Sequence, residues 1–169
     1  RLLYDRIIYM GEEFTPESCN LIVTQLLYLN NLSNDPIDIY INSSGGSVID
    51  GLSIIDTINL IKSPVNTICT GLAASMGAVL LSCGKKGSRA VLPHSRVMIH
   101  QVSSGMWGTF SDLEIELKQT ERCKQDIYKI LAENLNKPYE EIEKLCDRNN
   151  WFIGQEAVDL GIVDKVLCK

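Results

Sequence analysis

Ser75 lies in the stretch of this sequence that most favours chemistry. It follows a β-branched run at residues 65–70 and precedes an apolar segment that continues through Leu81, so a strand is predicted to turn sharply into a helix at the serine. Gly71 and Gly77 suit a tight corner, where the backbone passes close to an exposed side chain. Free N–H groups at a helix N-terminus stabilise the negative charge that develops when a serine attacks a carbonyl. An ordinary N-cap accounts for the same serine, so this pattern leaves both interpretations open.

A serine nucleophile needs a base, and the sequence contains two histidines. His94 follows a proline in a predicted turn, where an exposed histidine ordinarily has no chemical role. His100 ends a predicted apolar strand at residues 96–100, where burial of the ring requires a hydrogen-bond partner. The pattern fits a structural histidine and a catalytic base equally well.

Attack on a carbonyl also needs two donors that face the developing oxyanion. Gly45 and Gly46 lie between an alternating strand, residues 37–42, and a helix that begins near Val48, so their N–H groups are unobstructed. The N–H of Met76 follows the serine. A glycine pair also serves any tight strand-to-helix turn, but the absence of a following G-K-[ST] excludes a phosphate loop.

Composition narrows the class of protein. The chain has 169 residues, 45% of them hydrophobic, and a net charge of −5, which predicts one globular domain and argues against nucleic-acid binding. No apolar run reaches the roughly 18 residues that span a bilayer, so no membrane partner is expected. The six cysteines form no C-x-x-C pair, which favours reduced thiols in the cytoplasm. No metal or other cofactor is expected, because no histidine or cysteine cluster is present.

Hydrophobic periodicity predicts alternating strands and helices. Two successive strand-helix units imply an α/β fold with a mainly parallel sheet and right-handed crossovers. A capping box at Ser111 predicts a helix of roughly 24 residues, long enough to project from the domain. The predicted strands are residues 6–9, 37–42, 65–70, 89–92, 96–100 and 162–167, and the other predicted helices begin at Pro16, Val48, Met76, Tyr139 and Glu156.

Three stretches carry a resemblance to a known family. Residues 39–48 (IYINSSGGSV), 71–78 (GLAASMGA) and 92–101 (LPHSRVMIHQ) closely resemble the signature blocks of ClpP, the family of proteolytic subunits of Clp proteases. The match runs from about Arg6 to Val166. It implies an α/β fold of the ClpP/crotonase type, with a single peptidase domain over residues 1–169. It also implies that residues 101–135, with the projecting helix, form the handle that joins two rings.

The resemblance also implies roles for individual residues. Ser75 would be the nucleophile and His100 the base, with the N–H groups of Gly46 and Met76 as the oxyanion hole. Substrate would add as a strand with little side-chain specificity. The implied substrate contacts are Gly45, Val48, Gln101 and Ser103.

Asn149 is a departure from the family pattern. It stands where the family has the aspartate of the catalytic triad, next to Asp147 and Arg148, which match a pair that makes ring-to-ring contacts. An amide oxygen can accept the Nδ1 proton of His100, but it brings no charge to stabilise the imidazolium. The resemblance therefore implies Asn149 as third catalytic residue and a peptidase that is weak alone.

Family members assemble as heptamers, stacked in pairs as tetradecamers, and receive unfolded polypeptides from a Clp-family ATPase. The ATPase would be a separate partner, because this sequence contains no nucleotide-binding motif. Two alternatives stay open. The chain could be a mainly structural or regulatory ring subunit that assembles with a catalytic ClpP paralogue. It could also be a crotonase-like acyl-CoA enzyme, which needs no serine–histidine pair.

Overall fold

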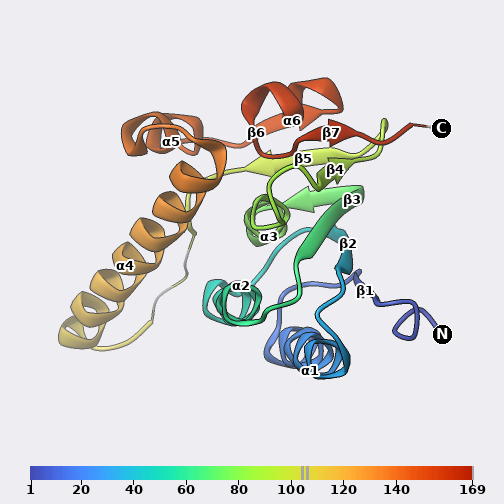
Figure 1. Ribbon diagram of the computed structural model, residues 1–169. Helices are drawn as coiled ribbons and strands as arrows, with labels where there is room; N and C mark the ends of the chain where they lie inside the picture. The colour runs from blue at the N-terminus through green and yellow to red at the C-terminus, as the bar shows by residue number, and fades with distance from the viewer. Residues whose placement is uncertain (104, 106, 169) are drawn as a thin grey trace.

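The strands pair into one seven-stranded sheet in the order β1-β2-β3-β4-β7, with β5 joined to β3 and β6 joined to β5 (Figure 1). The computed structural model describes residues 1–103, 105 and 107–168. The strands are β1 (Ile7–Met10), β2 (Ile37–Ser43), β3 (Val65–Ala74), β4 (Arg89–Val91), β5 (Arg96–Ile99), β6 (Asn150–Ile153) and β7 (Lys165–Val166). The helices are α1 (Pro16–Leu32), α2 (Val48–Leu60), α3 (Met76–Ser82), α4 (Phe110–Leu135), α5 (Tyr139–Leu145) and α6 (Gln155–Leu160).

The parallel pairings confirm the predicted α/β class. β1 pairs with β2, β2 with β3, and β3 with both β4 and β5, in each case in parallel. On β2 the alternation is complete, because Ile37, Ile39 and Ile41 are all fully buried. α1 begins at Pro16 behind the predicted cap, and Thr15 Oγ1 accepts a hydrogen bond from the Ser18 N–H at 3.2 Å. These elements place one apolar core between the sheet and its helices.

β3 continues four residues beyond the predicted end at position 70. Its pairing with β2 shifts between Ile41 and Ser43, because an irregularity at this point adds two residues to β3. Gly71 lies in this irregularity with φ of 83°, a conformation that favours glycine. Small residues after position 70 resembled a turn, and the structure uses them for a bulged strand that reaches Ala74.

α4 extends away from the sheet, with its N-terminal end farthest from it (Figure 1). It begins at Phe110 behind Thr109, whose Oγ1 accepts the Asp112 N–H at 3.3 Å, so the predicted capping box at Ser111 is wrong. Both hydroxyl residues have an acidic residue three positions later, and the earlier cap gives a helix of 26 residues. Its C-terminal half is buried through Ile127, Tyr128 and Leu131, whereas residues near its start are exposed.

β6 was not predicted from the sequence. Residues 150–153 pair antiparallel with β5, in the register Ile99 to Asn150 and Met98 to Trp151. Trp151 and Ile153 are exposed, so this short edge strand has little of the burial that identifies a strand in a sequence. The antiparallel pairing brings the chain after α5 back to the end of β5.

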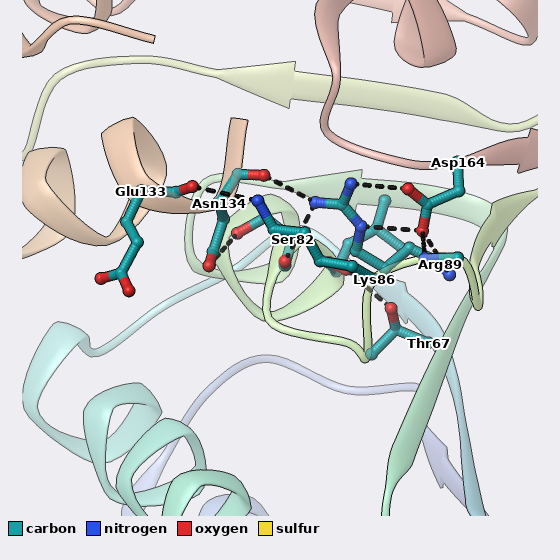
Figure 2. Close-up of polar contacts among 9 residues, drawn as sticks. Thr67, Ser82, Lys86, Arg89, Glu133, Asn134 and Asp164 are labelled. Atoms are coloured by element: carbon teal, nitrogen blue, oxygen red, sulfur yellow. Dashed lines mark hydrogen bonds and ion pairs between the residues drawn. The ribbon is translucent and has the colours of Figure 1, made fainter. Parts of the chain in front are cut away.

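Arg89 joins the C-terminal end of α4 to the sheet (Figure 2). Its guanidinium makes a two-pronged ion pair with Asp164, with Nη2 at 2.8 Å from Oδ1 and Nε at 3.0 Å from Oδ2. Nη1 donates to the carbonyl of Asn134 at 2.9 Å. Arg89 is only 4% exposed, so its charge requires these partners. Hydrogen bonds from Arg89, together with the Gly87 N–H, lower the pKa of Asp164 from 3.8 to about 2.

Asp164→Asn is therefore expected to lower the free energy of unfolding by roughly 2 kcal/mol at neutral pH, since one pKa unit corresponds to about 1.4 kcal/mol. The pKa is lowered on folding, so this stabilisation is present above about pH 4 and is lost as the pH falls towards 2. Urea unfolding at several pH values measures it. The control is Asp126→Asn, in an exposed part of α4. An equal gap between Asp164→Asn and wild type at pH 2 and pH 7 would contradict this account.

Candidate active site

Ser75 occupies the corner between β3 and α3. Its φ of 55° and ψ of −124° are strained for a residue with a side chain, and they project the hydroxyl out of the turn. Ser75 stands at the N-cap position of α3, but its side chain makes no capping hydrogen bond. Every residue of α3 is buried, so the helix is fixed by its packing. Ser75 is therefore the N-cap residue by position, but its hydroxyl does not cap the helix and is available for chemistry.

His100 faces Ser75 because of the pairing of β3 with β5. Ala74 is opposite Met98 in parallel register, and the Ser75 N–H donates to the Met98 carbonyl at 2.9 Å. The two strands therefore end side by side, where parallel α/β sheets commonly place functional groups. His100 Nε2 lies 2.9 Å from Ser75 Oγ. When Nδ1 carries the ring proton, Nε2 accepts the hydroxyl proton, as a general base must.

His94 lies in the exposed turn between β4 and β5. Its carbonyl accepts a hydrogen bond from the Arg96 guanidinium at 2.7 Å, which is a structural contact. The structure thus brings only one of the two histidines to the serine.

The glycine turn after β2 lies against Ser75. A Cβ on Gly45 would be 2.7 Å from Ser75 Cβ and 3.0 Å from the Met76 nitrogen, so only glycine allows this approach. Gly45 and Gly46 have φ of 94° and 144°. Gly46 and Met76 both line the cavity in front of the serine. Met76 is the first residue of α3, so its N–H has no acceptor within the helix.

The serine, the histidine and most of the predicted substrate contacts line a cavity of about 50 Å³. Val48, Gln101 and Ser103 line it, whereas Gly45 is buried and is not part of the lining. Sequence reasoning missed its apolar lining, which is Val79, Ile99, Val102, Ile127 and Leu131. The sequence predicted α4 as a long projecting helix, and nothing in its pattern indicated that Ile127 and Leu131 line the cavity in front of the serine.

Asn149 is placed by β6. Because Ile99 pairs with Asn150 in antiparallel register, the next residues at that end are His100 and Asn149. Both line one open hollow with Gln101, Asp147 and Arg148. Asn149 is exposed, and in the described part of the chain no hydrogen bond joins it to His100.

Asp147 and Arg148 project from the loop before β6. Their side chains are 73% and 89% exposed, and Arg148 Nε lies 3.8 Å from Asp147 Oδ2, a weak pair at a wet surface. The Gln101 side chain donates to the Asp147 carbonyl at 2.9 Å. That bond joins this loop to the strand end that carries His100.

Other classes of site have little support. All six cysteines are free thiols, and burial raises the pKa of Cys69 and of Cys146 to about 11, so neither is a reactive thiolate. Within residues 1–103, 105 and 107–168, no cluster of three metal-ligating side chains occurs. The same residues include no helix with the length and apolar character needed to cross a membrane.

Comparison with known proteins agrees with this geometry. The family model described as Clp protease matches residues 1–169. The ATP-dependent Clp protease proteolytic subunit of Porphyromonas gingivalis is 49% identical over 100% of this chain and 77% of its own length. Proteolytic subunit 1 of Salinibacter ruber is 46% identical over 99% of this chain and 72% of its own length, and the Bacteroides fragilis subunit is 46% identical over 100% and 82%. This chain therefore belongs to the Clp protease family.

Proposed function

We propose that the chain is a serine endopeptidase subunit of a self-compartmentalised Clp protease, which degrades unfolded polypeptides delivered by an ATP-dependent unfoldase. The observation that carries this proposal is the 2.9 Å contact between Ser75 Oγ and His100 Nε2 at a strand-to-helix corner, in a chain of this family. Relatives that are named proteolytic subunits support the same activity.

The proposed reaction begins when His100 takes the hydroxyl proton and Ser75 Oγ attacks the scissile carbonyl. The carbonyl oxygen becomes an oxyanion, for which the N–H groups of Gly46 and Met76 are the proposed donors. His100 then gives the proton to the leaving amine, and an acyl-enzyme remains on Ser75. Water, deprotonated by His100, hydrolyses that ester and restores the serine.

Substrate is proposed to bind as an added strand between two segments that border the cavity. One segment runs from Gly46 to Val48 and the other from Gln101 to Ser103, and parts of both are exposed. Backbone hydrogen bonds would supply most of the affinity, so many sequences would be accepted. This fits a protease of unfolded chains.

Asn149 is proposed as the third catalytic residue. Because it is an amide and not a carboxylate, we propose that the chain alone is only weakly active. In serine proteases of other folds, replacing the triad aspartate by asparagine lowers turnover by about 10⁴-fold, because the amide favours the wrong imidazole tautomer. An Oδ1 atom turned towards Nδ1 would avoid part of that loss. The same residue favours a second candidate, a mainly structural or regulatory ring subunit that assembles with a catalytic ClpP paralogue.

Ring assembly is part of the proposal. The exposed pair Asp147 and Arg148 and the projecting start of α4 are the proposed contacts between two heptamers, and the handle would comprise residues 101–135. Positions 104 and 106 of that segment are outside the described residues. The six free thiols suit a reducing compartment, so we place the protein in the cytoplasm.

Ser75→Ala is expected to abolish hydrolysis of a short fluorogenic peptide and labelling by a fluorophosphonate, while the circular dichroism spectrum stays that of the wild type. The reason is that Ser75 is the side chain that hydrogen-bonds His100 Nε2 among the described residues. Turnover rates of purified protein measure the effect. Ser88→Ala is the control, because Ser88 lies in the turn before β4, outside the proposed catalytic group and the proposed substrate segments. Unchanged turnover in Ser75→Ala would refute the assignment.

Ser75→Gly is expected to be more stable than Ser75→Ala by roughly 1 kcal/mol or more. Glycine adopts a φ of 55° and ψ of −124° without the strain that a Cβ imposes. Thermal unfolding of the two inactive variants measures the difference. Equal melting temperatures would show that the corner is not strained in solution.

Asn149→Asp is expected to raise peptide turnover at least several-fold. A carboxylate next to His100 holds the reactive tautomer and stabilises the imidazolium, which an amide does only in part. Turnover and particle mass are to be measured for both forms in one buffer, alone and with a catalytic ClpP from the same source.

Asn150→Asp is the matched control, because it adds the same charge one residue away, on β6. If Asn149→Asp and Asn150→Asp raise turnover equally, the gain comes from general electrostatics. If neither changes turnover, Asn149 is not the missing acid of this site.

A further inference from the structure

Residues 12–14, which precede α1, are hydrogen-bonded to the glycine turn that contains Gly45 and Gly46. The Phe14 N–H donates to the Gly45 carbonyl at 2.8 Å, and the Ser47 N–H donates to the Phe14 carbonyl at 2.8 Å. Ser43 Oγ adds to this clamp, because it donates to the Glu12 carbonyl at 2.5 Å and accepts the Gly45 N–H at 3.1 Å. The backbone on both sides of Gly46 is thus fixed by residue 14.

These bonds determine which way the Gly46 N–H points. The Gly45 carbonyl and the Gly46 N–H belong to one trans peptide unit, in which the two groups point in opposite directions. Because Phe14 holds the carbonyl, the N–H must point away from Phe14. Gly46 lines the cavity that contains Ser75, so this is the orientation that an oxyanion donor needs.

The Phe14 side chain connects the two proposed donors. Phe14 is 1% exposed, and a Cβ on Gly51 in α2 would clash with Met76 Cε and lie 3.1 Å from Phe14 Cδ1. The ring and the Met76 side chain therefore share the space over Gly51. Movement of the ring would disturb the backbone at Phe14, which orients Gly46. It would also disturb the side chain of Met76, whose N–H is the second proposed donor.

We propose that Phe14 is a positioning residue of the oxyanion hole. Its N–H orients the Gly46 donor, and its buried ring holds that donor in fixed relation to Met76. The inference rests on the proposed peptidase function and adds to it a residue outside the blocks that identified the site. Phe14 acts through Gly46 and touches no substrate.

The sharpest test replaces Phe14 by phenyllactic acid, its α-hydroxy analogue, which keeps the ring and replaces the N–H by an ester oxygen. The matched control is the α-hydroxy analogue of Ile37, whose N–H donates to the Pro64 carbonyl at 2.9 Å at the opposite end of β2. The measurements are kcat and KM for a fluorogenic peptide, and the inhibition constant of a peptide aldehyde, whose adduct with Ser75 forms an oxyanion. Active-site titration with a fluorophosphonate corrects for unfolded protein.

The Phe14 ester is expected to lower kcat by about tenfold or more, since losing a whole oxyanion donor costs about 10² to 10³ in other enzymes. KM should stay within about twofold, and aldehyde binding should weaken by a factor similar to that in kcat. The Ile37 ester should leave all three values within about twofold. A purely structural role would lower the titrated fraction and leave kcat per active site unchanged, and this result would overturn the inference.

Two side-chain substitutions test the inference if the ester variant does not fold. Phe14→Leu should lower kcat per active site with KM unchanged, whereas Leu26→Val, also in the buried core, should lower only stability. Equal kcat in the two variants would overturn the inference. A wild-type protein without labelling at Ser75 or hydrolysis would instead overturn the proposed function, and the inference would fall with it.

Discussion

The corner at Ser75 is the constraint on which the rest of the site depends. A non-glycine residue at φ 55° and ψ −124° persists only where the surrounding structure fixes it, here through the bond from its N–H to Met98 and through the fully buried α3. This backbone conformation directs the serine side chain out of the turn, so the hydroxyl does not cap α3. The same corner requires glycine at position 45, because any Cβ there would enter the space of Ser75 and Met76.

The antiparallel pairing of β6 with β5 brings Asn149 to the end of the sheet that carries His100. β5 and β6 are antiparallel neighbours in an otherwise parallel sheet, and the chain between them forms α4 and α5. His100 leaves β5 at the same end from which Asn149 enters β6. The inserted α4 begins far from the sheet and runs back towards it, and Ile127 and Leu131 in its C-terminal half line the cavity. Cavity lining and projecting surface thus belong to one helix.

Sequence reasoning located the features that depend on local patterns. The Ser75 corner and the helix at Pro16 follow from small-residue and capping signals, and the structure confirms them. β6 was missed because an exposed edge strand of four residues has almost no hydrophobic signal, and its partner β5 lies far away in the sequence. The role of Phe14 in the turn was equally invisible, since it arises from two backbone hydrogen bonds to a turn about thirty residues later.

The effect of a carboxylate at position 149, the proposed third catalytic position, would depend on its exposure to solvent. Two opposite charges about 4 Å apart attract by about 1 kcal/mol in water and about 4 kcal/mol at an effective dielectric of 20. Asn149 is exposed in the single chain, so a carboxylate there would act near the lower value. Contacts that cover the loop from Asp147 to Asn149 would exclude water and move the interaction towards the higher value. The catalytic cost of the amide would therefore be smallest while this loop is exposed to water and would increase with any contact that buries it.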